Sequence, residues 1–113
     1  MGRLESREYY ILLALAGSDK HGQAIARDAE RLSAGEQRLW PASLYGALES
    51  LSEQGWIEEL PAGTDDRPDP SHRKRFYRIT GRGYVALATE TRRLASVVKL
   101  ARARIKVRSG EAG

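Results

Sequence analysis

Two hydroxyl-bearing side chains near the middle of the chain are placed to bind something outside it. In the stretch PASLYGALESLSEQGWIEEL, which runs from residue 41 to residue 60, the leucines recur three and four residues apart. This spacing predicts a helix with one buried stripe, and Ser43, Tyr45 and Gly46 lie off that stripe. Serine and tyrosine hydroxyls can bond to phosphate oxygens, and serine can also reach a base edge.

A basic run, Arg73, Lys74 and Arg75, offers a second kind of chemistry. Guanidinium and ammonium groups neutralise phosphates and release the counterions that surround a polyanion. The rest of the chain supports such a partner, because charge is divided unevenly along it. Residues 1–60 carry a net charge of −4, whereas residues 61–113 carry +8.

Apolar periodicity predicts two helices ahead of the hydroxyl-bearing stretch. The first extends from an N-cap at Ser6 to Gly17, and it is apolar on nearly every side between residues 9 and 16. We therefore expect it to be central and buried. The second helix begins in the region 19–22, has apolar residues on one side only, and ends at residues 33–35.

A third helix and a β-hairpin follow. Residues 36–40 are too few for a helix and are interpreted as a small strand. Pro41 suits the first turn of the third helix, which Gly55 ends. Residues 56–60 and 75–79 are predicted to form paired strands, separated by a loop rich in proline, glycine and aspartate.

The last helix begins at an N-cap, Thr80, and is longer than a small domain needs for its own core. A heptad pattern along it predicts a dimerisation seam. The seam residues are Tyr84, Leu87, Leu94, Val98, Ala101 and Ile105. Two helices joined by a turn and followed by a hairpin form a helix-turn-helix with a wing. The expected fold is mainly α with a small β-hairpin. Residues 1–80 would form a winged helix-turn-helix DNA-binding domain, residues 81–108 a dimerisation helix, and residues 109–113 a disordered tail.

The sequence excludes several classes of function. The chain has no cysteine, no glycine-rich phosphate loop and no G-x-S-x-G turn, so catalysis is unsupported. His21 and His72 have no further ligands at metal spacing, so neither a metal nor a cofactor is predicted. No apolar run approaches the length of a membrane span, and we expect a cytoplasmic protein without a membrane partner.

Four stretches together resemble the PadR family of bacterial transcriptional regulators. They are HG at 21–22, PASLYGALESLSEQGWIEE at 41–59, RKRFYRIT at 73–80 and the turn around Gly83 that leads into a long helix. The likeness covers most of residues 6–105. It is to the shorter branch, which has a single C-terminal dimerisation helix.

The resemblance implies a homodimer of winged helix-turn-helix subunits that binds a roughly palindromic operator in double-stranded DNA. It implies a repressor that releases the operator when a small-molecule effector or another signal arrives. The third helix would enter the major groove, and the basic run would form the side of the wing. The DNA-binding residues are then Ala42, Ser43, Tyr45, Gly46, Arg73, Lys74 and Arg75.

The chain departs from the family pattern in three ways. Trp40 stands where a capping serine is usual and cannot cap the helix, so the N–H groups there need another acceptor, such as a DNA phosphate. The third helix has no lysine or arginine and carries Glu49 and Glu53. The predicted wing loop is long and acidic.

Other interpretations of these residues stay open. Tyr45 is either a phosphate contact or an amphipathic surface tyrosine, and Ser43 either contacts DNA or is simply a first-turn residue. The basic run contacts phosphate, pairs with aspartates of the loop at 61–71, or is a solvated charge run. The whole chain is either a DNA-binding regulator or a winged-helix module that binds other proteins. Binding to phosphates would weaken steeply with salt, whereas an apolar protein interface would not.

Overall fold

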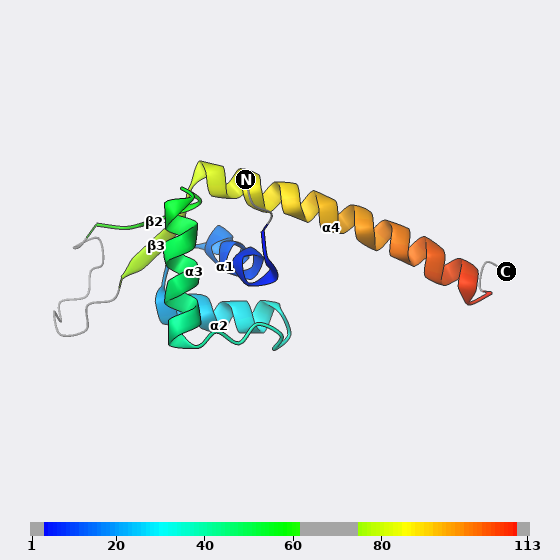
Figure 1. Ribbon diagram of the computed structural model, residues 1–113, viewed down its shortest axis with the longest axis horizontal. Coiled ribbons are helices and arrows are strands. Elements are labelled where there is room, and N and C mark those ends of the chain that lie inside the picture. The colour runs from blue at the N-terminus through cyan, green and yellow to red at the C-terminus, as the bar shows by residue number, and fades with distance from the viewer. Residues whose placement is uncertain (1–3, 62–74, 111–113) are drawn as a thin grey trace.

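The computed structural model describes residues 4–61 and 75–110. The chain is mainly helical, with a small three-stranded antiparallel sheet and a long C-terminal helix that extends away from the rest (Figure 1). The elements in order are α1 (Ser6–Gly17), β1 (Lys20–His21), α2 (Gly22–Leu32), α3 (Pro41–Glu53), β2 (Ile57–Glu59), β3 (Phe76–Ile79) and α4 (Gly81–Arg108). The fold class expected from the sequence is confirmed.

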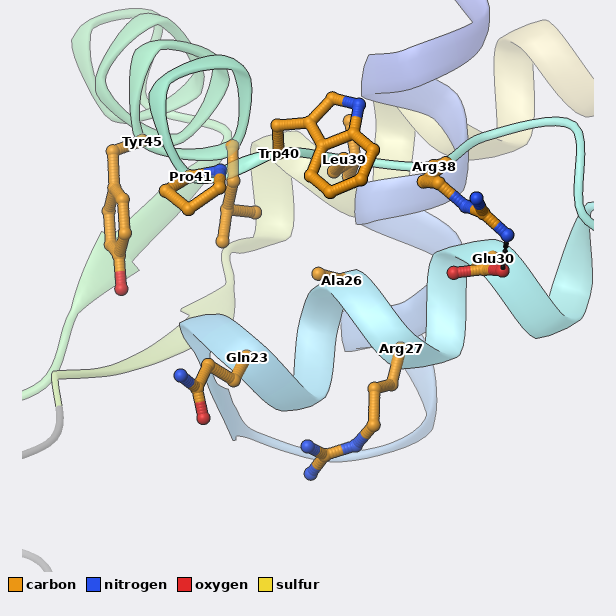
Figure 2. Close-up of a pocket in the computed structure, with 10 residues that line it drawn as sticks. Gln23, Ala26, Arg27, Glu30, Arg38, Leu39, Trp40, Pro41 and Tyr45 are labelled. Atoms are coloured by element: carbon orange, nitrogen blue, oxygen red, sulfur yellow. Dashed lines mark hydrogen bonds and ion pairs between the residues drawn. The ribbon is translucent and has the colours of Figure 1, made fainter.

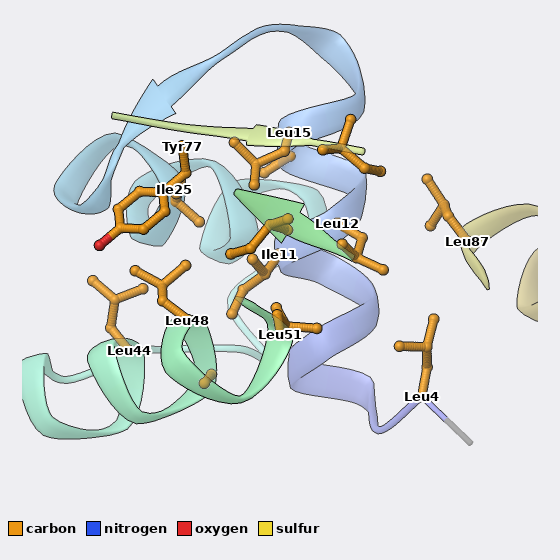
Figure 3. Packing of buried hydrophobic residues seen from close by; sticks show 14 residues of the cluster. Leu4, Ile11, Leu12, Leu15, Ile25, Leu44, Leu48, Leu51, Tyr77 and Leu87 are labelled. Carbon is orange, nitrogen blue, oxygen red and sulfur yellow. The ribbon is translucent and has the colours of Figure 1, made fainter. Parts of the chain in front are cut away.

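The core forms where α1, α2 and α3 meet the sheet (Figure 3). As expected, α1 is central, although its aromatic residues and Leu13 are only partly buried. The leucine stripe of α3 points inward, because its members recur at helical spacing and each is at most 3% exposed. The largest fully buried side chains of this core are Ile11, Leu12, Leu15, Ile25, Leu48, Leu51 and Ile57.

The N-terminal end of α1 lies one residue earlier than predicted. Glu5, rather than Ser6, is the N-cap residue. The backbone N–H of Glu5 donates to the Oε1 atom of Glu8, 3.0 Å away, which satisfies a donor that the helix itself leaves without an acceptor. The sequence signal was present in Glu8, three residues after the cap.

The sheet has the strand order β1-β3-β2, with both pairs antiparallel. The predicted strand at residues 36–40 is wrong, because the structure has irregular backbone there. Ala34 and Gly35 adopt positive φ angles and turn the chain back along α2. Local contacts then hold the segment, since Gln37 N–H donates to Ser33 Oγ at 2.8 Å. The third strand of the sheet is β1, which pairs with β3.

Thr80 caps α4 as predicted and also ties it to the end of α3. Its Oγ1 atom accepts from the N–H of Gly83 at 3.0 Å and donates to the carbonyl of Gly55 at 2.6 Å. The first turn of α4 thus lies against the turn that precedes β2. Within the described ranges, no helix has both the length and the apolar character of a membrane span.

The C-terminal end of α4 has a regular cap. Ser109 is the C-cap residue, and its backbone N–H donates to the carbonyl of Ile105 at 2.9 Å. Residues 111–113 of the predicted tail lie outside the described residues, as does the predicted loop from residue 62 onwards.

Candidate nucleic-acid interface

The start of α3 is an exposed helix end without a side-chain cap. Trp40 is the N-cap residue and makes no capping hydrogen bond, as its indole predicts, and Pro41 occupies the first turn. Because an indole has no acceptor for the N–H groups of the first turn, these donors face outward for water or an anionic partner. The predicted contact residues are grouped around this end.

Four of the seven predicted DNA-binding residues belong to α3. Ala42, Tyr45 and Gly46 are exposed, whereas Ser43 is half-buried. A methyl group built on Gly46 would meet nothing within 4 Å, so this part of the helix surface is open. The structure therefore leaves a small, smooth face along α3 on the side away from the leucine stripe.

Tyr45 rests on the beginning of α2. An added Cβ atom at Gly22 would lie 2.9 Å from the Tyr45 Oη atom. The side chain is still 47% exposed, so it lies at the surface rather than in the core. Its position over the α2 start is compatible with both interpretations of Tyr45.

A groove of about 650 Å³ lies between α2 and the start of α3. Figure 2 shows the Trp40 ring above it, with Gln23 and Arg27 on the side of α2. The polar rim also includes Arg38, which pairs with Glu30 at 3.4 Å. The full lining is Gln23, Ala26, Arg27, Glu30, Arg38, Leu39, Trp40, Pro41, Leu44 and Tyr45.

Gln23, Arg27 and Arg38 were not predicted as site residues. A signal for the first two was available, because positions 23 and 27 are four residues apart and lie off the buried face formed by Ile25 and Ala29. Arg27 has no ion-pair partner among the described residues. Arg27 and Arg38 bring positive charge to the neighbourhood of α3, which itself has no lysine or arginine.

Arg75 is the one residue of the predicted basic run that the structure describes, since Arg73 and Lys74 lie outside the described residues. Its Nε atom lies 3.7 Å from Glu59 Oε2 on the neighbouring strand. Burial raises the pKa of the hydroxyl of Tyr77, the β3 residue paired with Glu59. The charge of Glu59 adds to this rise, while Arg75 opposes it. The guanidinium of Arg75 therefore already has an acidic partner, Glu59, within the hairpin.

The predicted dimerisation residues divide into two groups along α4. Leu87 is 8% exposed and belongs to the core of its own chain. Tyr84 donates a hydrogen bond from its hydroxyl to the carbonyl of Ala16 at 3.2 Å, so it also contacts α1 of the same chain. The residues further along are Leu94, which is half-buried, and the exposed Val98, Ala101 and Ile105.

A second hydrogen bond joins α1 and α4. The hydroxyls of Tyr9 and Thr91 are 2.7 Å apart. Together with the Tyr84 contact, this bond fixes the direction in which α4 leaves the rest of the chain. Beyond Leu94 every described residue of α4 is exposed, including Val97, Leu100 and Val107.

Comparisons with solved structures show how widely this arrangement recurs. A PadR family transcription regulator from Clostridium difficile R20291 has a TM-score of 0.72 at 18% identity, covering 89% of this chain and 99% of that one. A transcriptional regulator from Clostridium thermocellum has a TM-score of 0.68 at 20% identity, with 85% and 86% covered. RosR from H. salinarum has a TM-score of 0.65 at 22% identity, with 96% and 94% covered. These likenesses concern the fold.

Sequence comparison identifies the family. No curated protein matches the chain. Residues 11–89 match the Transcriptional regulator PadR-like family, a range that extends from the middle of α1 into α4 and includes the groove and all of α3. The match spans more than two-thirds of the sequence, so the chain belongs to the PadR-like family of transcriptional regulators and is not an enzyme.

Proposed function

We propose that this transcriptional regulator binds double-stranded DNA in a sequence-specific manner as a homodimer and represses transcription until an effector releases it. The observation that carries the proposal is the exposed, uncapped start of α3 beside the arginines of α2 and the following loop. A helix end of this kind fits the major groove, and the surrounding cations and hydroxyls suit the phosphates on either side.

The reading surface is built from α3 and its surroundings. Ala42, Ser43, Tyr45 and Gly46 face the bases and the nearest phosphates, and Arg75 with the rest of the basic run contacts the backbone from the hairpin. Arg27 adds a cation on the other side of α3. Glu49 and Glu53 oppose binding electrostatically, so we expect the affinity to depend on the flanking cations more than on α3 itself.

The homodimer is supported by the part of α4 that lies beyond Leu94. Exposed apolar side chains on an isolated helix contribute nothing to stability unless another surface covers them. A second copy of α4 supplies such a surface, and Val98, Ala101 and Ile105 recur at the three- and four-residue spacing of a helix pair. A twofold dimer predicts half-sites about one helical turn, about 34 Å, apart.

Fluorescence anisotropy with the DNA just upstream of the protein's own gene tests this function. We expect binding that is tighter than to a scrambled duplex and that falls steeply as salt rises, because each neutralised phosphate releases counterions. Equal binding to both duplexes, or binding indifferent to salt, would contradict the proposal. That result would favour a module that binds another protein, which the acidic character of α3 also suits.

A further inference from the structure

The outward face of α3 is chemically unusual for a helix that reads DNA. Ala42, Gly46 and Glu49 recur four and three residues apart, so they lie on one face, and each is exposed. Trp40 stands immediately before them and is 64% exposed. That face therefore offers a methyl group, an open backbone and a carboxylate, but no cation. The indole of Trp40 lies around the helix end from it, beside Leu44 in the groove.

These groups restrict which bases α3 can recognise. In the major groove guanine presents two acceptors, and arginine or lysine is the usual partner for them. No residue of α3 is an arginine or a lysine, and the carboxylate of Glu49 can only accept. Thymine differs from the other bases by a C5-methyl group, which is recognised through apolar contact. Alanine and tryptophan side chains supply that contact.

The surroundings of Trp40 favour DNA as the occupant of this apolar surface. Its ring lies above the groove (Figure 2), and Ala26, Pro41 and Leu44 are among the apolar residues that line this groove. Arg27 and Arg38 line the same groove, where Arg38 is paired with Glu30 and Arg27 has no ion-pair partner among the described residues. An apolar strip with cations at its edges complements a base edge that is bordered by phosphates.

We propose that Trp40 and Ala42 read the C5-methyl groups of thymines in each half-site, and that thymine contacts replace guanine contacts in α3. This inference rests on the proposed DNA binding and adds the class of base that is recognised. It assigns specificity to Trp40, a residue outside the predicted binding set. Removing a single buried methyl group should weaken binding about fourfold per half-site.

The experiment begins with selection of duplexes from a random library by the full-length protein. Each thymine of the enriched half-site is then replaced by deoxyuridine, which lacks the methyl group and keeps the base-pairing groups. We expect one or two positions at which deoxyuridine weakens binding about fourfold. If the protein binds the selected duplex and no position responds, the thymine inference fails while the proposed function stands. If no sequence is enriched, both fail.

Variants assign the effect to the side chain. In the Trp40→Ala variant, replacing the affected thymine by deoxyuridine should no longer weaken binding. In Trp40→Phe most of this loss of affinity should remain, because an aromatic ring is still present. Val85→Ala, at a residue 66% exposed on α4, is the matched control and should retain the full penalty. A penalty unchanged in Trp40→Ala would overturn the role of Trp40. Circular dichroism shows whether each variant is folded. The deoxyuridine scan of the unmodified protein tests the thymine contacts even if a variant does not fold.

Discussion

Tyr45 and Gly22 lie so close that a methyl group on the glycine would come within 2.9 Å of the tyrosine Oη atom. The obstructing atom is at the free end of a side chain on the surface, so the ring can move away without disturbing the core. We expect Gly22→Ala to leave the fold intact and to lower DNA affinity about tenfold, the loss that accompanies one displaced hydrogen bond to a phosphate. Anisotropy titrations against the operator measure this change.

Tyr45→Phe tests the cause of that loss. The single change should weaken binding by a similar factor, because it removes the hydroxyl and leaves the ring. The double variant should be no weaker than Tyr45→Phe alone, since both changes act on one contact. Fully additive losses would show that Gly22 acts on DNA binding by another route.

Gly46→Ala should separate stability from binding. Nothing lies within 4 Å of a methyl group at this position, and alanine is favoured over glycine within a helix by about 1 kcal/mol. We expect a higher free energy of unfolding together with weaker DNA binding, because the added methyl group meets the bases. Ser52→Ala, at an exposed position in the last turn of α3, is the control and should leave affinity unchanged. Unaltered binding by Gly46→Ala would remove Gly46 from the interface.

Glu59→Gln should strengthen DNA binding. The carboxylate of Glu59 is 3.7 Å from the guanidinium of Arg75 and would compete with the proposed DNA phosphate for it. Removing this charge should raise affinity about twofold at low salt, with a smaller gain at high salt, as for other exposed pairs. Glu58→Gln, whose partner is Arg78 at 4.0 Å, is the matched control on the same strand. Equal gains from both variants would indicate a general charge effect instead of the release of Arg75.

Two glycines in the first turn of α4 should respond in opposite ways to alanine. A methyl group at Gly83 would overlap the backbone carbonyl oxygen of Trp56, which cannot move without shifting the chain. We expect Gly83→Ala to destabilise the protein by about 3 kcal/mol. Gly81→Ala meets nothing within 4 Å and should be neutral or stabilising by less than about 1 kcal/mol. Urea unfolding of both variants measures the difference, and a stable Gly83→Ala would contradict the close packing of α4 on this turn.

The proposed dimer makes a prediction for two neighbouring residues of α4. Ile105 is 66% exposed and Val107 is 69% exposed, but only Ile105 belongs to the predicted seam. We expect Ile105→Asp to yield monomers, because a charge would be buried between the two helices, and Val107→Asp to leave dimers. Sedimentation velocity distinguishes the two states. Dimers of Ile105→Asp would place the contact between subunits elsewhere.

The elements with strong local signals were predictable from the sequence. Pro41, the leucine stripe and Thr80 each set a helix boundary or face through contacts made within a few residues, and α3 and α4 begin where they predict. The strand β1 was missed because it has two residues and pairs with Phe76 and Tyr77, which are far along the chain. Such a pairing is decided by the assembled sheet and leaves no periodic pattern.

The candidate site was predictable only in part, for a related reason. The outward residues of α3 follow from its helical spacing, but the groove requires Trp40 and Arg27, which come together only when α2 packs against α3. The heptad pattern likewise cannot tell which positions face α1 of the same chain. Leu87 fits the seam by spacing and is used by the core instead.

The hydrogen bond between Tyr9 and Thr91 makes the outer part of α4 a lever arm with a defined fulcrum. From Thr91 to Arg108 the helix extends about 26 Å, given a rise of 1.5 Å per residue. A tilt of about 10° at the fulcrum would carry its far end through about 4.5 Å, more than the 3.4 Å between successive base pairs of a DNA strand. In the proposed dimer, joined along these two helices, the hydrogen bond made by Tyr9 would therefore set the distance between the two DNA-binding faces.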